Sequence, residues 1–154
     1  MNHEILFRGK GNPEYNDGDW YYGYLIFDGE DYQIVEPKYG SWRRTVLKET
    51  VGEFTGMTDK NGTKIFEGDI VRTQPFYTRP YSAKRKEKQF LGIVECHTKS
   101  FRNPNSPTNG QKYDSSWRVN IVEDIGDYGY YSWNRFWNCE VVGNKFDNPE
   151  LLPK

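Results

Sequence analysis

The stretch from Val51 to Arg72 places a tight turn between two short segments that favour strands. The turn is Asp59-Lys60-Asn61-Gly62, and Asn and Gly adopt positive φ at low cost. Gly56 and Gly68 mark two further bends, because glycine has no Cβ to oppose them. After Gly68-Asp69 the residues Ile70-Val71-Arg72 favour a strand. This order of bends and strands is typical of a small, strongly bent β-barrel.

Patterns along the rest of the chain predict further strands and no long helix. Asp28–Asp31 is a turn signal between two strand patterns and predicts a hairpin. The predicted strands outside the central stretch are residues 4–8, 19–27, 32–36, 90–97, 117–122 and 140–143. Residues 37–44 read as irregular, 75–88 and 98–116 as long loops, and 133–138 as one helical turn capped by Ser132. The last strand is expected to close the barrel.

The length and composition limit how much core this chain can build. At 154 residues it fits one domain, or a small barrel with an additional N-terminal region. Hydrophobic residues are 35% of the chain but aromatic residues are 17%, so we expect a core of Tyr, Trp and Phe. The boundary is predicted near Thr50. It separates an N-terminal β-hairpin region, residues 1–49, from a barrel, residues 50–154.

Three motifs in a fixed order resemble the YopX family, which is found mainly in bacteriophages and prophages. They are Glu4–Arg8, Val51–Val71, and Glu140–Asn144 followed by Asn148–Leu152. The departures are small: Met57 stands for the usual Leu, Phe66 for Tyr, and Gly9 for Ala-Trp. The resemblance implies a mainly β fold with an SH3-like β-barrel in the C-terminal part, and a phage or prophage protein. It carries no biochemical activity over to this chain.

The charge balance and the cysteines point to a protein of the host cytoplasm. The formal net charge is -1 and the pI is about 6.1, so the whole chain lacks the basic character that binds nucleic acid by counterion release. No run approaches the roughly 18 apolar residues that span a bilayer, and the N-terminus lacks a secretory signal pattern. Cys96 and Cys139 fit a reducing compartment, although a disulfide between them stays open.

A basic segment is the first candidate site. Its cations are Arg79, Lys84, Arg85, Lys86 and Lys88, with Tyr77 and Tyr81 beside them. Cations that neutralise phosphates next to aromatic rings that stack on bases predict a contact with single-stranded nucleic acid. The alternative is a solvated loop, which the slightly acidic balance of the whole chain favours.

An aromatic cluster is the second candidate site. Its members are Tyr128, Tyr130, Tyr131, Trp133, Phe136 and Trp137. Such a cluster is either core, a subunit interface or a groove for a proline-rich peptide.

No residue pattern predicts a catalytic centre, a metal site or a cofactor. The acidic pairs, such as Asp17 with Asp19, stand at turns and lack the spacing of a metal-binding loop. Asp69 is interpreted as a structural residue whose carboxylate accepts backbone N–H groups in its bend. Cys96 and His97 are adjacent in a strand and therefore point to opposite faces.

These observations favour a protein that acts by binding and is not an enzyme. We expect a protein-interaction or assembly module that self-associates through aromatic-rich β surfaces and has a phage or host protein as its partner. The alternative is a nucleic-acid-binding accessory protein that uses residues 79–88. No membrane association is expected.

Overall fold

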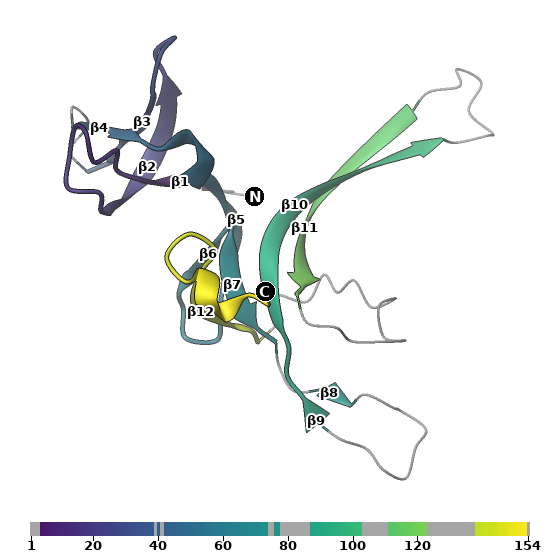
Figure 1. Ribbon diagram of the computed structural model, residues 1–154. Coiled ribbons are helices and arrows are strands. Elements are labelled where there is room, and N and C mark those ends of the chain that lie inside the picture. Colours follow the sequence, from purple (N-terminus) through teal and green to yellow (C-terminus); the bar gives the residue numbers. More distant parts are fainter. Residues whose placement is uncertain are drawn as a thin grey trace.

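A computed structural model describes residues 4–38, 40, 42–73, 76–77, 87–102, 111–122 and 138–153. The described chain is mainly β, as predicted, and its strands form antiparallel sheets (Figure 1). Its two described 3₁₀ turns, η1 (Lys48–Thr50) and η3 (Pro149–Leu151), are three residues each, which agrees with the expectation of no long helix.

The larger sheet has six strands in the order β4-β3-β2-β1-β5-β6. Their bounds are β1 (Phe7–Lys10), β2 (Trp20–Phe27), β3 (Tyr32–Val35), β4 (Arg43–Val46), β5 (Gly52–Thr58) and β6 (Lys64–Phe66). The predicted hairpin at Asp28–Asp31 is confirmed, because Phe27 pairs with Tyr32 across the turn. The first strand starts three residues later than predicted, and β4 includes Arg43 and Arg44, which the sequence placed in an irregular segment.

The second sheet has four strands in the order β11-β10-β7-β12. Their bounds are β7 (Asp69–Arg72), β10 (Leu91–Arg102), β11 (Gln111–Ile121) and β12 (Glu140–Asn144). Two further short strands, β8 (Phe76–Tyr77) and β9 (Glu87–Lys88), pair with each other. They bring together the two ends of the predicted loop at 75–88.

The prediction of a long loop at residues 98–116 is wrong for 98–102 and 111–116, which are strand, while residues 103–110 lie outside the described residues. β10 continues to Arg102 and β11 begins at Gln111, so the two strands pair from Gly92↔Ile121 to Arg102↔Gln111. The segment is polar, with four serines and three asparagines, and it has no apolar alternation for a sequence pattern to detect. Backbone pairing between the two strands makes them regular, and a local sequence pattern does not record such pairing. Figure 1 shows this ribbon leaving the body of the molecule.

The described strands form open sheets and show no closed barrel. β12 pairs with β7 and lies at the edge of its sheet, so in the described part of the chain it does not close a barrel as expected. Gly11 forms one isolated bridge with Val46, which brings β4 back toward the end of β1 and curls the larger sheet. A Cβ on Gly9 would lie 2.8 Å from a methyl group of Val46, so the curl depends on a glycine there.

The turns predicted in the central stretch are confirmed. Gly56 and Gly68 have φ of 81° and 83°, a region that favours glycine, and the register of β5 with β6 shifts between Phe54 and Thr58. The amide of Asp59 donates to the carbonyl of Thr63 at 2.8 Å and closes the turn.

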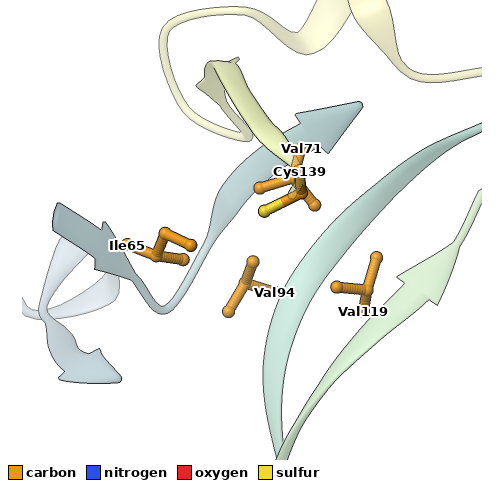
Figure 2. Close-up of a cluster of buried hydrophobic side chains, with 5 residues drawn as sticks. All are labelled: Ile65, Val71, Val94, Val119 and Cys139. Carbon is orange, nitrogen blue, oxygen red and sulfur yellow. The ribbon is translucent and has the colours of Figure 1, made fainter. Parts of the chain in front are cut away.

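The main core lies between strands of the two sheets (Figure 2). It is formed by Ile65, Val71, Val94, Val119 and Cys139. A smaller cluster contains Leu6, Phe54 and Phe66. The predicted inward alternation of Trp117, Val119 and Ile121 is confirmed, since Val119 is in the main cluster and the other two pack against it. The buried set has more aliphatic than aromatic side chains, contrary to the composition-based expectation, because several described aromatics remain exposed.

The six-stranded sheet contains strands from both sides of the predicted boundary near Thr50. β1 pairs with β5 through Phe7↔Glu53 and Arg8↔Gly52. The division into residues 1–49 and 50–154 stays a prediction.

Candidate functional site

A cleft of about 470 Å³ lies where the two sheets meet. β1, β2 and β6 contribute side chains from the larger sheet, and β7 and β12 contribute from the smaller one. Its lining residues are Leu6, Arg8, Tyr22, Thr63, Lys64, Phe66, Asp69, Val141, Gly143 and Asn144. The volume is within the range of small-ligand and side-chain pockets, about 300–1,000 Å³.

A buried ion pair joins the two sheets at this cleft. Arg8 of β1 places Nη1 2.6 Å from Oδ1 of Asp69, the first residue of β7, and the two side chains are 7% and 2% exposed. Nη2 of Arg8 donates to the carbonyl of Glu67 at 3.1 Å. The pair therefore positions the Gly68 bend against β1.

Aromatic rings surround the Arg8 guanidinium. Its Cζ lies 4.9 Å from the ring centroid of Trp20 and 5.2 Å from that of Phe66. A cation near aromatic faces is stabilised by the ring quadrupole, more strongly where water is excluded. Nε of Arg8 is buried without a hydrogen-bond partner. The aromatic contacts offset part of the cost of burying this charge.

The carboxylate of Asp69 is fully committed to structural contacts. Its Oδ1 forms the ion pair with Arg8, and its Oδ2 accepts a hydrogen bond from the amide of Phe66 at 2.8 Å. Burial raises the pKa of Asp69, while Arg8 and the Phe66 amide act in the opposite direction. Its predicted structural role is confirmed. Both carboxylate oxygens are therefore engaged in contacts that hold the Gly68 bend.

Asp59 makes a second connection between the sheets. Its Oδ1 accepts the amides of Asn61 and Thr63 at 2.8 and 2.9 Å, and its Oδ2 accepts the amide of Val141 in β12 at 3.0 Å. Burial acts to raise the pKa of Asp59, but these backbone donors hold it below its usual value. One carboxylate thus organises the turn and attaches β12 to it.

Exposed ion pairs lie near the cleft. Lys64, in the lining, is 2.7 Å from Glu4. Asp147 accepts from Lys10 and from the indole of Trp20, both at 2.5 Å. The Lys10 contact is the main cause that lowers the pKa of Asp147 to about 2. Since each of these cations has a carboxylate beside it, these pairs give the cleft no strong charge of either sign.

Two exposed tyrosines stand beside the cleft on β2. Tyr22 and Tyr24 are 45% and 55% exposed, and residues two apart in a strand share a face. The ring of Tyr22 packs edge-on to Phe66, with ring centroids 5.5 Å apart. The cleft therefore continues into an aromatic face, which we call the β2 face: Tyr22, Tyr24 and the cleft wall at Phe66.

The lining of the cleft contains no cysteine or histidine among the described residues. Within the described residues, no group of three or more His, Cys, Asp and Glu side chains could hold a metal ion. Both cysteines are free thiols. Burial raises the pKa of Cys139 to about 11, so this thiol is a core residue rather than a nucleophile.

A protein-family model, described as YopX protein, matches residues 27–153. The chain belongs to the YopX family. The match covers most of the chain and includes two of the three motifs that suggested it, at Val51–Val71 and at Glu140–Leu152. No curated protein is significantly similar to the chain. YopX membership assigns the protein to a family and gives no biochemical activity. The proposed function therefore depends on the contacts described above.

Both sites predicted from the sequence fall largely outside the described part of this YopX chain. Of the basic segment, Arg79, Lys84, Arg85 and Lys86 lie outside the described residues, and Lys88 is described as a main-chain position in β9. The whole aromatic cluster lies outside them: Tyr128, Tyr130, Tyr131, Trp133, Phe136 and Trp137. Both remain predictions.

Sequence reasoning did not find the cleft. Arg8 and Asp69 each belong to a YopX-like motif, but their pairing requires the Gly68 bend to meet β1. The sequence contains a weak signal for the cleft. Tyr22 and Tyr24 lie two residues apart in β2, so they share a face, and both are exposed rather than part of the core.

No helix among the described residues is long and apolar enough to span a membrane.

Proposed function

We propose that this YopX protein is a non-catalytic protein-interaction module that binds its partner on the β2 face. The observation that supports the proposal is the pair of exposed rings, Tyr22 and Tyr24, beside a cleft with apolar and aromatic walls. Aromatic side chains are enriched in protein interfaces, where they bury a large area at low cost in side-chain entropy. The buried carboxylates near the cleft are engaged in structural hydrogen bonds, which agrees with a role in binding.

The partner that fits is a protein segment with an apolar or aromatic side chain. Leu6, Phe66 and Val141 provide apolar contact inside the cleft, while Tyr22 and Tyr24 extend it outward. Because the ion pairs around the cleft neutralise their own charges, a strongly charged ligand gains little there. A phage or host protein of the cytoplasm is the partner that the proposal implies.

We also propose, from the family resemblance, that the C-terminal part forms an SH3-like barrel.

The test is a selection of peptides from a random display library against the purified full-length protein. Selected peptides should bind with micromolar dissociation constants. Replacing Tyr22 and Tyr24 together by Ser should weaken binding at least about tenfold, because each ring supplies contact area. Tyr15→Ser is the matched control, since Tyr15 is 66% exposed in the loop before β2 and outside the cleft lining.

Two outcomes would contradict the proposal. Peptides whose affinity is unchanged in the Tyr22→Ser/Tyr24→Ser variant would place the binding surface elsewhere. Selection of no peptide, together with tight binding of single-stranded DNA or RNA that is lost when Lys84, Arg85, Lys86 and Lys88 become Ser, would favour the nucleic-acid alternative.

A further inference from the structure

The edge of β4 in the larger sheet is covered by the chain itself. The amide of Asn12 donates to the carbonyl of Thr45 at 3.0 Å, and the amide of Leu47 donates to the carbonyl of Lys10 at 2.8 Å. Together with the Gly11↔Val46 bridge, these contacts use backbone groups that an edge strand would otherwise leave free.

The edges of β6 and β12 are covered by side chains. The amide of Phe66 in β6 donates to Asp69. In β12 the amide of Val141 donates to Asp59, and that of Asn144 donates to Oδ1 of Asn148 at 3.2 Å. Side-chain oxygens therefore take the place of a neighbouring strand's acceptors at these three amides, which disfavours pairing with another chain there.

The outer edge of β11 has no such cover among the described residues. β11 is an end strand of its sheet, and it is eleven residues long. The amide of Val122 donates to the carbonyl of Leu91, so residue 122 directs its backbone groups toward β10. In an antiparallel pair every second residue does the same, and the continuous register extends this to residues 112, 114, 116, 118 and 120. The backbone groups of residues 111, 113, 115, 117, 119 and 121 then point outward.

We propose that β11 pairs antiparallel with β11 of a second copy of the chain, about a two-fold axis at Ser116. In this register the outward-pointing residues meet one another as 111 with 121, 113 with 119 and 115 with 117, each pair occurring twice. The two four-stranded sheets then become one continuous sheet across the dimer. A two-fold contact needs a self-complementary surface, and a strand that pairs with its own copy provides one.

The charges along β11 favour this register over those centred on Ser115 and Asp114. Pairing about Ser116 uses all eleven residues and sets Asp114 opposite Arg118 of the second copy twice. A register centred on Ser115 would set Lys112 opposite Arg118, and one centred on Asp114 would set that residue opposite itself. Like charges directly opposite each other destabilise a sheet, so both alternatives are disfavoured.

Arg118 supports the same assignment. Glu95 stands opposite Arg118 in β10 and accepts from Asn120, and no described residue forms a hydrogen bond or ion pair with the Arg118 guanidinium, whose Nε is buried without a partner. A carboxylate from a second copy would satisfy a donor group that the described part of the chain leaves unpaired. This proposal does not rest on the β2 face, because β11 contributes no residue to the cleft lining.

The first experiment changes one outward amide. Ser115→Pro removes an N–H that points away from β10, and proline is tolerated on the free side of an edge strand. Light scattering and sedimentation of the full-length protein should show a dimer for the wild type, with the dissociation constant about 10- to 100-fold higher for Ser115→Pro. Ser115→Thr keeps the N–H and should leave the dimer unchanged.

The second experiment tests the register. In a Cys96→Ser background, Ser116→Cys places two thiols at the two-fold axis, where opposed Cα atoms lie about 4.5 Å apart and a disulfide can form. Mild oxidation should therefore yield a covalent dimer. Asn120→Cys is the matched control, since Asn120 is exposed on the same strand but does not meet its own copy.

A strictly monomeric wild-type protein at micromolar concentration would overturn the proposal. A dimer that is unaffected by Ser115→Pro, or that cross-links equally through Ser116→Cys and Asn120→Cys, would place the contact elsewhere and would overturn it as well. None of these outcomes affects peptide binding by the β2 face, so the two proposals fail separately.

Discussion

The junction between the two sheets and the β10–β11 ribbon use hydrogen bonds in opposite ways. At the junction, side chains from distant parts of the chain satisfy backbone groups: Asp69 takes the amide of Phe66, and Asp59 takes the amide of Val141. In the ribbon, two neighbouring strands satisfy each other over eleven residue pairs and leave an outer edge without a described neighbour. The junction thus holds the two sheets together within the chain, whereas the ribbon depends on pairing between two neighbouring strands.

This difference has a simple physical basis. A buried polar group without a partner costs about 1–3 kcal/mol, so the groups at the junction must be paired within the chain. Backbone groups at an exposed strand edge bond to water at little cost and can exchange that water for a partner strand. Substitutions in the two regions should therefore have very different effects on the free energy of unfolding.

The largest effect is expected at Arg8. Arg8→Ala leaves the Asp69 carboxylate buried without its partner, which should lower the free energy of unfolding by about 3–5 kcal/mol. Urea denaturation followed by tryptophan fluorescence measures this change. The double variant Arg8→Met/Asp69→Leu should recover most of the loss, because replacing a buried ion pair by apolar groups is often neutral. A loss below 1 kcal/mol for Arg8→Ala would mean that the ion pair does not hold the sheets together.

The next largest effect is expected at Asp59. Asp59→Ala removes the acceptor of three backbone amides and should lower the free energy of unfolding by about 2–3 kcal/mol. Asp28→Ala is the matched control, since the Asp28 carboxylate also accepts two backbone amides in a turn but is exposed. We expect a change below about 1 kcal/mol there. Equal losses in both variants would show that the connection to β12 adds nothing to the turn itself.

A smaller, pH-dependent effect is expected at Asp147. Its pKa in the folded protein is about 2, below the unfolded value of about 3.9, so its contribution is present above pH 4 and is lost as the pH falls toward 2. Because the carboxylate and Lys10 are partly exposed, we expect only about 0.5–1 kcal/mol. Asp147→Asn should remove this amount at pH 7 and flatten the acid side of the stability profile measured by urea denaturation. A profile that keeps its slope between pH 4 and 2 in the variant would assign the dependence to other carboxylates.

The smallest effect on folding is expected at the ribbon edge. Ser115→Pro should change the free energy of unfolding by less than about 0.5 kcal/mol when measured below the dissociation constant of the dimer. Ser116→Pro removes an amide that points toward β10 and should destabilise the ribbon. Hydrogen exchange of the β10 amides distinguishes the two variants. Similar exchange in both would contradict the assignment of inward and outward residues.

The amino-acid sequence by itself determined the local elements of this protein. Gly56, Gly68 and the Asp59–Gly62 turn have the conformations that their residue types predict, since positive φ and tight turns depend on one to four neighbouring residues. The hairpin at Asp28–Asp31 and the inward alternation around Val119 were read in the same way. The structural role of Asp69 also followed from its place after a glycine bend.

The tertiary structure alone decided which of these elements meet. Arg8 is paired with Asp69, and Val141 with Asp59, because distant strands cross at those points, and no local pattern records such a crossing. The outer part of the ribbon was predicted to be a loop because its regularity comes from backbone pairing between two strands, which no local pattern records. The cleft and the β2 face likewise exist only where β1, β2, β6 and β12 converge, since a binding surface is a property of the folded arrangement.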